Sequence, residues 1–431
     1  MRVLLTTIGS QGDVRPLVAL ASRLRESGHG AHLCVSPDLR DWVEGLGFPF
    51  TPIGPQMRGM VGAPAPKPAG SAPPPSPEQM RGQVEATLAR ESATITEAAR
   101  GCEVIVAAAG RPLIPARTVA ETLGIRYVFA VFSPSHLPSP HHAPFGVRGA
   151  GQGQPSSPAG NLELWDRHGR QLNDRLRTGL NRHRAAAGLS PVDDVRDHIF
   201  TSRPWLAADP VLAPWPGAAS EVFQTGAWIL PDPRPLDPRL EAFLAAGDPP
   251  VYFGFGSMRM APEVVQVVAE SARRVGRRAI IAGGWAGLSL TAADPGLLVI
   301  GEVNQQVLFR RVAAVVHHGG AGTTTAAALA GAPQVIVAQA FDQPYWARRI
   351  THLGIGAAHP GATPAADSLT AALWSALDPA VAARARVLTF GLDAGGAQEA
   401  AASLIASPGK IPADDLTDVS AADECNVRDA A

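Results

Sequence analysis

What this sequence lacks narrows the classes of protein that it can belong to. Its 431 residues include three cysteines, Cys34, Cys102 and Cys425, too few and too scattered for a disulfide framework or a zinc site. With 37 basic and 38 acidic residues, its composition gives no reason to expect nucleic acid or an anionic membrane as a partner. No apolar run approaches the ~18 residues of a membrane-spanning helix, and the N-terminus lacks the layout of a signal peptide. Together these absences predict a reduced, cytoplasmic protein without a transmembrane segment.

Two series of apolar runs alternate with helical patterns, and the length allows two or three domains of ~150 residues each. Strand-like runs of the first series lie at 2–7, 31–36, 103–107 and 126–131. Those of the second series lie at 251–255, 278–282, 297–300, 312–316 and 334–338. Such βαβ alternation is typical of doubly wound parallel sheets, so we expect an α/β protein with two Rossmann-like domains.

Composition changes mark the expected domain boundaries. We assign 1–212 to an N-terminal domain, 213–235 to a proline-rich linker, and 236–408 to a C-terminal domain. The polar, acidic residues 409–431 are expected to form a disordered tail.

Two segments interrupt the first series. The ranges 57–77 and 133–159 are rich in proline, glycine and alanine, and long loops inside a compact domain are usually functional or disordered. Residues 161–187 follow with the pattern of one or two amphipathic helices.

The run from His317 to Thr325, His-His-Gly-Gly-Ala-Gly-Thr-Thr-Thr, lies between a strand-like and a helix-like segment. Glycines at such a turn let the backbone approach a ligand, and the following helix N-terminus favours an anion. The run lacks the lysine of a Walker A loop and the glycine spacing of a dinucleotide fingerprint. It predicts a diphosphate site; the alternative is a tight helix-entry turn.

A second polar group follows the next apolar run. Asp342 and Gln343 offer a carboxylate and an amide, which together suit the hydroxyls of a sugar. The alternative is an N-cap, since Pro344 would then begin a helix. A diphosphate site followed by a sugar-hydroxyl site indicates a nucleotide-sugar donor.

These motifs resemble those of a known family. Residues 299–356 resemble the donor-binding region of GT-B glycosyltransferases of family 1. The run from Thr7 to Pro16, Thr-Ile-Gly-Ser-Gln-Gly-Asp-Val-Arg-Pro, resembles the first strand-to-helix loop of the same enzymes. The chain is most similar to the bacterial enzymes that glycosylate glycopeptide, macrolide and other polyketide aglycones, and to the sterol glucosyltransferases. This resemblance implies two facing Rossmann-like domains with a cleft between them.

The resemblance implies catalytic roles at the first loop. Asp13 matches the aspartate proposed as general base in the glycopeptide-type enzymes, and Ser10 would bond the acceptor or orient Asp13. From the residues alone, Asp13 also fits an N-cap, with Pro16 in the first helical turn.

The resemblance also assigns the contacts to the diphosphate. His318, Gly320, Gly322 and Thr323 match donors to phosphate, and Ser257 matches a further phosphate contact. An ordinary N-cap is the alternative for Ser257. His317 is expected to face away from His318, because neighbours on a strand point to opposite sides.

The remaining donor contacts follow in the same way. Asp342 and Gln343 match the sugar-hydroxyl clamp of the family. Val303, Asn304 and Trp285 lie where the family holds the nucleoside.

Departures from the family pattern bear on the chemistry. Many UDP-sugar enzymes carry a ribose-binding glutamate near Ala326, so the alanine leaves both UDP and dTDP open. There is no Asp-x-Asp triplet, the usual metal-diphosphate ligand of the other large glycosyltransferase fold, so we expect turnover without a metal or other cofactor. One base and no obvious nucleophile imply a single displacement that inverts the anomeric centre.

The sequence thus predicts transfer from a UDP- or dTDP-hexose to a hydroxyl of an apolar natural-product acceptor, such as a polyketide, glycopeptide or macrolide. A sterol or lipid glucosyltransferase, a sugar-nucleotide epimerase of the same architecture, and a non-catalytic relic stay open as alternatives.

Overall fold

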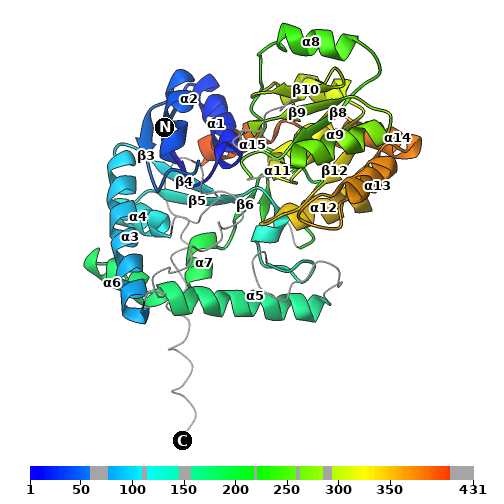
Figure 1. Cartoon of the computed structure of the whole chain (residues 1–431). Coiled ribbons are helices and arrows are strands. Elements are labelled where there is room, and N and C mark those ends of the chain that lie inside the picture. Colours follow the sequence, from blue (N-terminus) through cyan, green and yellow to red (C-terminus); the bar gives the residue numbers. More distant parts are fainter. Residues whose placement is uncertain are drawn as a thin grey trace, which may run out of the picture.

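The computed structural model describes residues 1–58, 76–108, 114–144, 157–217, 221–258, 263–284 and 294–407. Figure 1 shows two α/β bodies side by side, the first blue to green and the second mostly green to orange, each built on a sheet. Every strand pairing in the two sheets is parallel, which confirms the expected α/β class. The expected tail at 409–431 and Trp285 lie outside the described residues.

The first sheet has seven strands in the order β3-β2-β1-β4-β5-β6-β7. Its strands are β1 (Arg2–Thr7), β2 (Gly30–Val35), β3 (Phe50–Pro52), β4 (Val104–Ala108), β5 (Arg126–Val131), β6 (Trp205–Leu206) and β7 (Phe223–Gln224). Strand β7 lies inside 213–235, the range expected to be a linker, and pairs with β6. Because backbone pairing draws this segment into the sheet despite its prolines, the N-terminal sheet extends to Gln224.

Helices cover this sheet and extend below it. They are α1 (Gln11–Glu26), α2 (Arg40–Gly45), α3 (Pro77–Ala98), α4 (Pro115–Leu123), α5 (Pro158–Leu172), α6 (Thr178–Ala186) and α7 (Val195–Phe200), with the short helical segments η1 (Pro37–Leu39), η2 (Pro134–His136) and η3 (Asn173–Arg177). The expected amphipathic stretch 161–187 is one helical run, α5-η3-α6, and Figure 1 shows α5 along the lower edge of the molecule.

The second sheet has six strands in the order β10-β9-β8-β11-β12-β13. They are β8 (Val251–Gly254), β9 (Ala279–Ala282), β10 (Leu297–Ile300), β11 (Ala314–His317), β12 (Gln334–Ile336) and β13 (Gly356–Ala358). The accompanying helices are α8 (Pro238–Ala245), α9 (Val264–Arg274), α10 (Gln305–Leu308), α11 (Ala321–Leu329), α12 (Gln343–His352), α13 (Ala366–Ala376), α14 (Pro379–Leu388) and α15 (Gly396–Ala406), with η5 (Phe309–Arg311) and η6 (Thr389–Gly391).

Apolar contacts join the two halves. Helix α15, at the end of the described chain, packs against α1, and Ala400 and Leu404 belong to the core beneath the first sheet. A second apolar cluster includes Leu137 and Leu212 from the N-terminal half together with Trp346 of α12. Burial of this surface holds the two halves in a defined arrangement.

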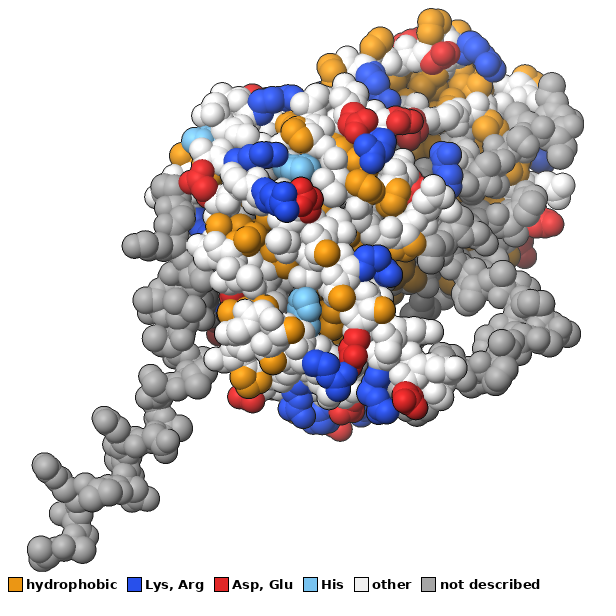
Figure 2. Space-filling model, turned by 90° about the vertical axis from the view of Figure 1, so that its left-hand side faces the viewer, with side chains coloured by type: hydrophobic (Ala, Val, Ile, Leu, Met, Phe, Trp, Pro, Cys, Tyr) orange, Lys and Arg blue, Asp and Glu red, His pale blue; other side chains and the backbone are white. Residues whose placement is uncertain are grey.

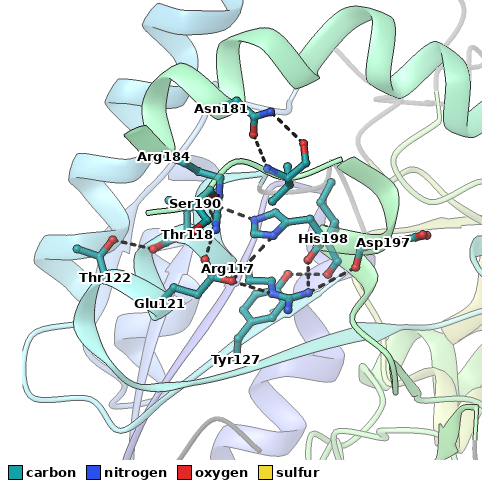
Figure 3. Close-up of polar contacts among 12 residues, drawn as sticks. Arg117, Thr118, Glu121, Thr122, Tyr127, Asn181, Arg184, Ser190, Asp197 and His198 are labelled. Carbon is teal, nitrogen blue, oxygen red and sulfur yellow. Dashed lines mark hydrogen bonds and ion pairs between the residues drawn. The ribbon is translucent and has the colours of Figure 1, made fainter. Parts of the chain in front are cut away.

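A buried polar network stabilises the lower part of the N-terminal half (Figure 3). Arg184 of α6 forms an ion pair with Glu121 of α4 and donates through Nε to the Ser190 carbonyl oxygen at 2.7 Å. Thr118 and His198 lie in the same network. Because the Arg184 side chain is only 7% exposed, its charge requires these partners, and they fix α6 on α4.

On the face in Figure 2, acidic and basic side chains are interspersed among the described residues, which fits the net charge of −1. Within the described ranges, no helix combines the length and apolar character needed to cross a lipid bilayer.

Candidate functional site

The candidate site lies where the two halves meet. Strands β1 and β11 each lead into a helix, and these two helices, α1 and α11, contact each other. Ala321, the first residue of α11, packs against the core of the first sheet and against the apolar cluster that both halves share. The carboxyl ends of parallel strands are where α/β proteins bind ligands, so this geometry brings both sequence motifs to one place.

The first motif forms the start of α1. Ser10 is the N-cap residue, and Asp13 lies in the first turn rather than at the cap. Oδ2 of Asp13 accepts hydrogen bonds from the Ser10 backbone N–H at 2.7 Å and from its hydroxyl at 3.0 Å. The side chain folds over Gly9, where an added Cβ would lie 2.4 Å from Oδ2, so glycine is required there.

The environment of Asp13 suits a proton acceptor. Burial raises its pKa to about 6, the bonds from Ser10 oppose this shift, and the charge of Asp342 adds to it. Both Ser10 bonds reach Oδ2, which leaves Oδ1 as the oxygen that can take a proton from a ligand. A carboxylate with a pKa near neutrality is both deprotonated and basic at physiological pH.

Asp342, in the C-terminal half, interacts electrostatically with Asp13. It occupies the N-cap position of α12, but in the described structure its side chain makes no capping bond. Its Oδ2 instead accepts a hydrogen bond from Nε1 of Trp346 at 2.8 Å. Burial raises the pKa of Asp342, and nearby His136 opposes the rise. The expected clamp carboxylate is therefore positioned by a buried indole.

His136 is a site residue that the sequence analysis did not single out. It ends η2, after β5, and its Nδ1 lies 3.3 Å from the Ser133 carbonyl oxygen. It interacts electrostatically with Asp342 across the interface of the two halves. Its position within 133–159, a range expected to be functional or disordered, was the only sequence signal.

The Gln343 side chain stabilises the turn before α12. Its side chain is buried, and Oε1 accepts hydrogen bonds from the N–H groups of Gln339 at 2.7 Å and Ala340 at 3.0 Å. The backbone of Gly319 lies against Gln343, since an added Cβ there would be 3.3 Å from the Gln343 Cβ. The amide oxygen therefore holds the turn, and the Nε2 group is the part that can reach a sugar hydroxyl.

The imidazole of His318 lies between two glycines. A Cβ added at Gly256 would be 2.9 Å from its Cε1, and one added at Gly320 would be 2.6 Å from its Nε2. Burial lowers the pKa of His318 to about 4, so the unliganded ring is neutral, and the nearby Gly254 carbonyl opposes the shift. Nδ1 is buried without a well-formed hydrogen bond among the described residues. A bound diphosphate would raise this pKa and convert the ring into a stronger donor.

The first turn of helix α11 follows His318 and carries three threonines. The hydroxyls of Thr324 and Thr325 donate hydrogen bonds to the carbonyl oxygens of Gly320 and Ala321, at 3.0 and 2.8 Å. Thr323 is half-buried and precedes them in the same turn. Its hydroxyl is therefore the one of the three that suits a phosphate.

Gly322 and Ser257 flank this turn. Gly322 is exposed, and an added Cβ there would enter open space, so an approaching phosphate meets bare backbone. Ser257 follows β8, the neighbour of β11 in the sheet, and is half-buried. The N-cap of the following helix α9 is Glu263, so Ser257 does not cap it.

His317 has a structural role, and its ring is in edge contact with that of His318, with 6.3 Å between the ring centroids. Its fully buried ring bonds through Nε2 to the Gln334 side-chain oxygen at 2.9 Å. Its Nδ1 accepts from the Gly319 N–H at 3.1 Å. These contacts shape the turn from beneath.

The expected nucleoside contacts are less uniform. The Asn304 side chain is buried: Oδ1 accepts from the Val307 N–H at 3.2 Å, and Nδ2 donates to the Asp232 and Arg234 carbonyl oxygens at 2.7 and 2.8 Å. The Asn304 side chain is thus committed to backbone groups, and the expected contact of this residue with the nucleoside stays a prediction. The backbone at Val303 stays a candidate, beside a cavity of about 480 Å³.

The described residues contain no group of three or more His, Cys, Asp and Glu side chains that could hold a metal ion.

Two family models match this chain. The glycosyltransferase family 28 N-terminal domain matches residues 3–139, and the erythromycin biosynthesis protein CIII-like C-terminal domain matches residues 269–400. Each match covers one of the two motifs and most of the strands of the sheet that carries it.

Similar proteins extend over nearly the whole chain. Glycosyltransferase GtfE of Amycolatopsis orientalis is 47% identical, with 95% of this chain and 98% of that protein covered. The vancomycin aglycone glucosyltransferase of the same organism is 45% identical (94% and 97% covered), and its dTDP-epi-vancosaminyltransferase 42% (89% and 92%).

Solved structures share the fold at lower identity. Glycosyltransferase VinC in complex with dTDP has a TM-score of 0.63 at 20% identity, with 94% of this chain and all 100% of that chain covered. The calicheamicin glycosyltransferase CalG4 has a TM-score of 0.65 at 18% identity, with 94% and 97% covered.

Proposed function

Since the chain belongs to the GT-B glycosyltransferases, we propose that it transfers a hexose from a UDP- or dTDP-sugar to a hydroxyl of a glycopeptide aglycone. The observation that carries this proposal is that Asp13 and Asp342, from opposite halves, interact electrostatically, while Gln343, next to Asp342, lies against Gly319 of the phosphate turn (residues 317–325). The names of the relatives support a natural-product acceptor over a sterol or other lipid.

In the proposed reaction, Asp13 takes the proton from the acceptor hydroxyl as its oxygen attacks the anomeric carbon. The bond from that carbon to the diphosphate breaks in the same displacement, so the anomeric centre inverts. Asp342 and the Nε2 group of Gln343 hold hexose hydroxyls and align the sugar for attack.

The leaving diphosphate gathers negative charge that the C-terminal half must stabilise. The N–H groups at the start of α11, the Thr323 hydroxyl and the His318 ring form the proposed donor set. A helix N-terminus carries about half a positive charge, so these groups replace a metal ion and no cofactor is needed. The cytoplasmic location expected from the sequence stays a prediction.

The test is a product analysis by mass spectrometry. Wild-type protein is incubated with the vancomycin aglycone and either UDP-glucose or dTDP-glucose, with and without excess EDTA. We expect a product heavier by one hexose, formed at equal rates in both conditions. Absence of any product from a panel of NDP-sugars and apolar acceptors would rule out the transferase, and loss of activity in EDTA would rule out metal-free catalysis. NMR of the product distinguishes inversion from retention.

A further inference from the structure

His142, in the segment between η2 and α5, contacts three aromatic side chains from different parts of the chain. Its ring lies edge-on to Trp165 of α5 at 6.2 Å between centroids, to Trp215 between β6 and β7 at 6.2 Å, and to Tyr345 of α12 at 6.1 Å. Edge-to-face pairs at these separations are favourable. Since α12 belongs to the C-terminal half and the other partners to the N-terminal half, the His142 ring joins the two.

Hydrogen bonds fix the position of this ring. Nε2 of His142 donates to the Leu137 carbonyl oxygen at 2.9 Å, and the His142 carbonyl oxygen accepts from Nε1 of Trp165 at 2.9 Å. Asn161 of α5 donates through Nδ2 to the Pro140 carbonyl oxygen at 2.7 Å. Burial lowers the pKa of His142, and the Leu137 carbonyl opposes the shift, so the ring is neutral with its proton on Nε2.

A continuous series of contacts leads from His142 to the carboxylate of Asp342. The ring of Tyr345 lies 5.3 Å from that of Trp346, edge to face, and Nε1 of Trp346 donates to Oδ2 of Asp342 at 2.8 Å. The Tyr345 backbone N–H also donates to the Asp342 carbonyl oxygen, at 2.9 Å. Tyr345 therefore links His142 to Asp342 both through its ring and through its backbone.

The N-terminal half holds α12 at a second point, farther along the helix. Nε of Arg349 donates to the Leu212 carbonyl oxygen at 2.7 Å, and Nη2 donates to that of Val211 at 3.1 Å. These bonds hold the body of the helix, whereas the contact of Tyr345 with His142 holds its first turn. The position of that first turn determines where the Asp342 carboxylate points.

We propose that His142 is a positioning residue for the donor sugar, whose ring, packed against Tyr345, orients the Asp342 carboxylate through the first turn of α12. This inference rests on the proposed function, which gives Asp342 its contact with the hexose. The sugar-binding carboxylate is thus oriented by a contact that exists only while the two halves meet.

The measured quantity is the ratio of two dissociation constants from calorimetric titration, that of the sugar nucleotide over that of the free nucleotide. The ligands are dTDP-glucose and dTDP, or the UDP pair if the wild type binds that pair instead. Because the two ligands share the nucleoside and the diphosphate, a change in the ratio reports on the hexose alone. A thermal melt of each variant reports on stability.

Two substitutions separate positioning from stability. His142→Ala removes the ring, so the ratio should rise about fivefold while the affinity for the free nucleotide stays unchanged. His142→Phe keeps a ring against Tyr345 but leaves the Leu137 carbonyl oxygen without its bond, so the ratio should stay as in the wild type. Both variants should melt at a lower temperature. His141→Ala is the matched control at the exposed neighbouring histidine, and both readouts should stay unchanged.

An unchanged ratio in His142→Ala would overturn the inference. So would an equal rise in His142→Ala and His142→Phe, because the ratio would then follow stability and not the ring. Asp342→Ala tests the proposed function on the same scale and should also raise the ratio. If Asp342→Ala raises it and His142→Ala does not, only this inference fails. If Asp342→Ala leaves it unchanged, the proposed hexose contact and this inference fail together.

Discussion

Asp13 and Ser10 form a closed pair in which one carboxylate oxygen accepts both the backbone N–H and the hydroxyl of Ser10, at 2.7 and 3.0 Å. The pair fixes the first turn of α1 and at the same time leaves a part-buried carboxyl group on the helix that contacts α11. A helix-start role and a catalytic role therefore coexist in Asp13, and they can be separated by substitution.

Asp13→Asn should abolish most of the activity without unfolding the protein. The asparagine oxygen can still accept from the Ser10 N–H, but the amide cannot take a proton from the acceptor. We expect kcat to fall by about a thousandfold, with unchanged affinity for dTDP by calorimetry. A variant that keeps the full transfer rate would remove Asp13 from the base role.

The pH dependence of the rate should follow Asp13. Its pKa of about 6 places the loss of activity on the acidic side, because protonation removes the base. The hydrogen bond from the Ser10 hydroxyl lowers this pKa, so Ser10→Ala, which removes that bond and keeps the backbone N–H, should move the acid limb of the kcat/KM profile to higher pH. An acid limb that stays in place in Ser10→Ala would show that another group controls it.

Stability should change with pH in the opposite sense to activity. The pKa of Asp13 rises from 3.8 to about 6 on folding, so the folded state binds the proton more tightly. Its contribution to stability is full below the unfolded value and is lost as pH rises through about 6. Asp13→Asn has no carboxyl group to ionise at this position, so it does not lose this stability as the pH rises. The melting temperature of Asp13→Asn minus that of wild type should therefore increase between about pH 4 and about pH 7. A constant difference over that range would contradict the burial of this charge.

Two glycines of the phosphate turn should respond differently to alanine. At Gly320 a Cβ would lie 2.6 Å from Nε2 of His318, whereas at Gly322 it would enter open space. Gly320→Ala should displace the ring and weaken dTDP binding at least tenfold, or about 1.4 kcal/mol. Gly322→Ala should keep the wild-type melting temperature, because the added Cβ meets no protein atom. Any loss of dTDP affinity in this variant would come from contact between that Cβ and the bound phosphate. Unchanged dTDP affinity in both variants would place the diphosphate elsewhere.

The network in Figure 3 provides a stability test away from the site. Arg184→Leu leaves Glu121, whose side chain is 18% exposed, without its partner from α6, and should cost about 3–5 kcal/mol of unfolding free energy. Arg182→Leu is the matched control on the same helix, because its ion pair with Glu85 is exposed and should contribute less than about 1 kcal/mol. Equal losses in denaturant unfolding would mean that burial does not distinguish the two pairs.

Local patterns determined much of what the sequence could predict. The phosphate turn lies within one strand-to-helix segment, so the placement of His318, Gly320 and Thr323 follows from glycine spacing and helix-start chemistry. His317 ends β11 and His318 follows it in the turn, so the positions of both histidines belong to the same short segment. The family resemblance rested on these segments, and the comparisons confirm the fold that it implied.

Relationships between distant segments were decided only by the tertiary structure. The sequence could not show that His136 and Asp342 come together across the interface, that Asn304 is committed to backbone, or that β7 joins the first sheet. Each depends on contacts between segments that lie far apart in the chain, which no local pattern encodes. Burial also sets the pKa of Asp13, so the sequence supplied the carboxyl group and folding supplied its basicity.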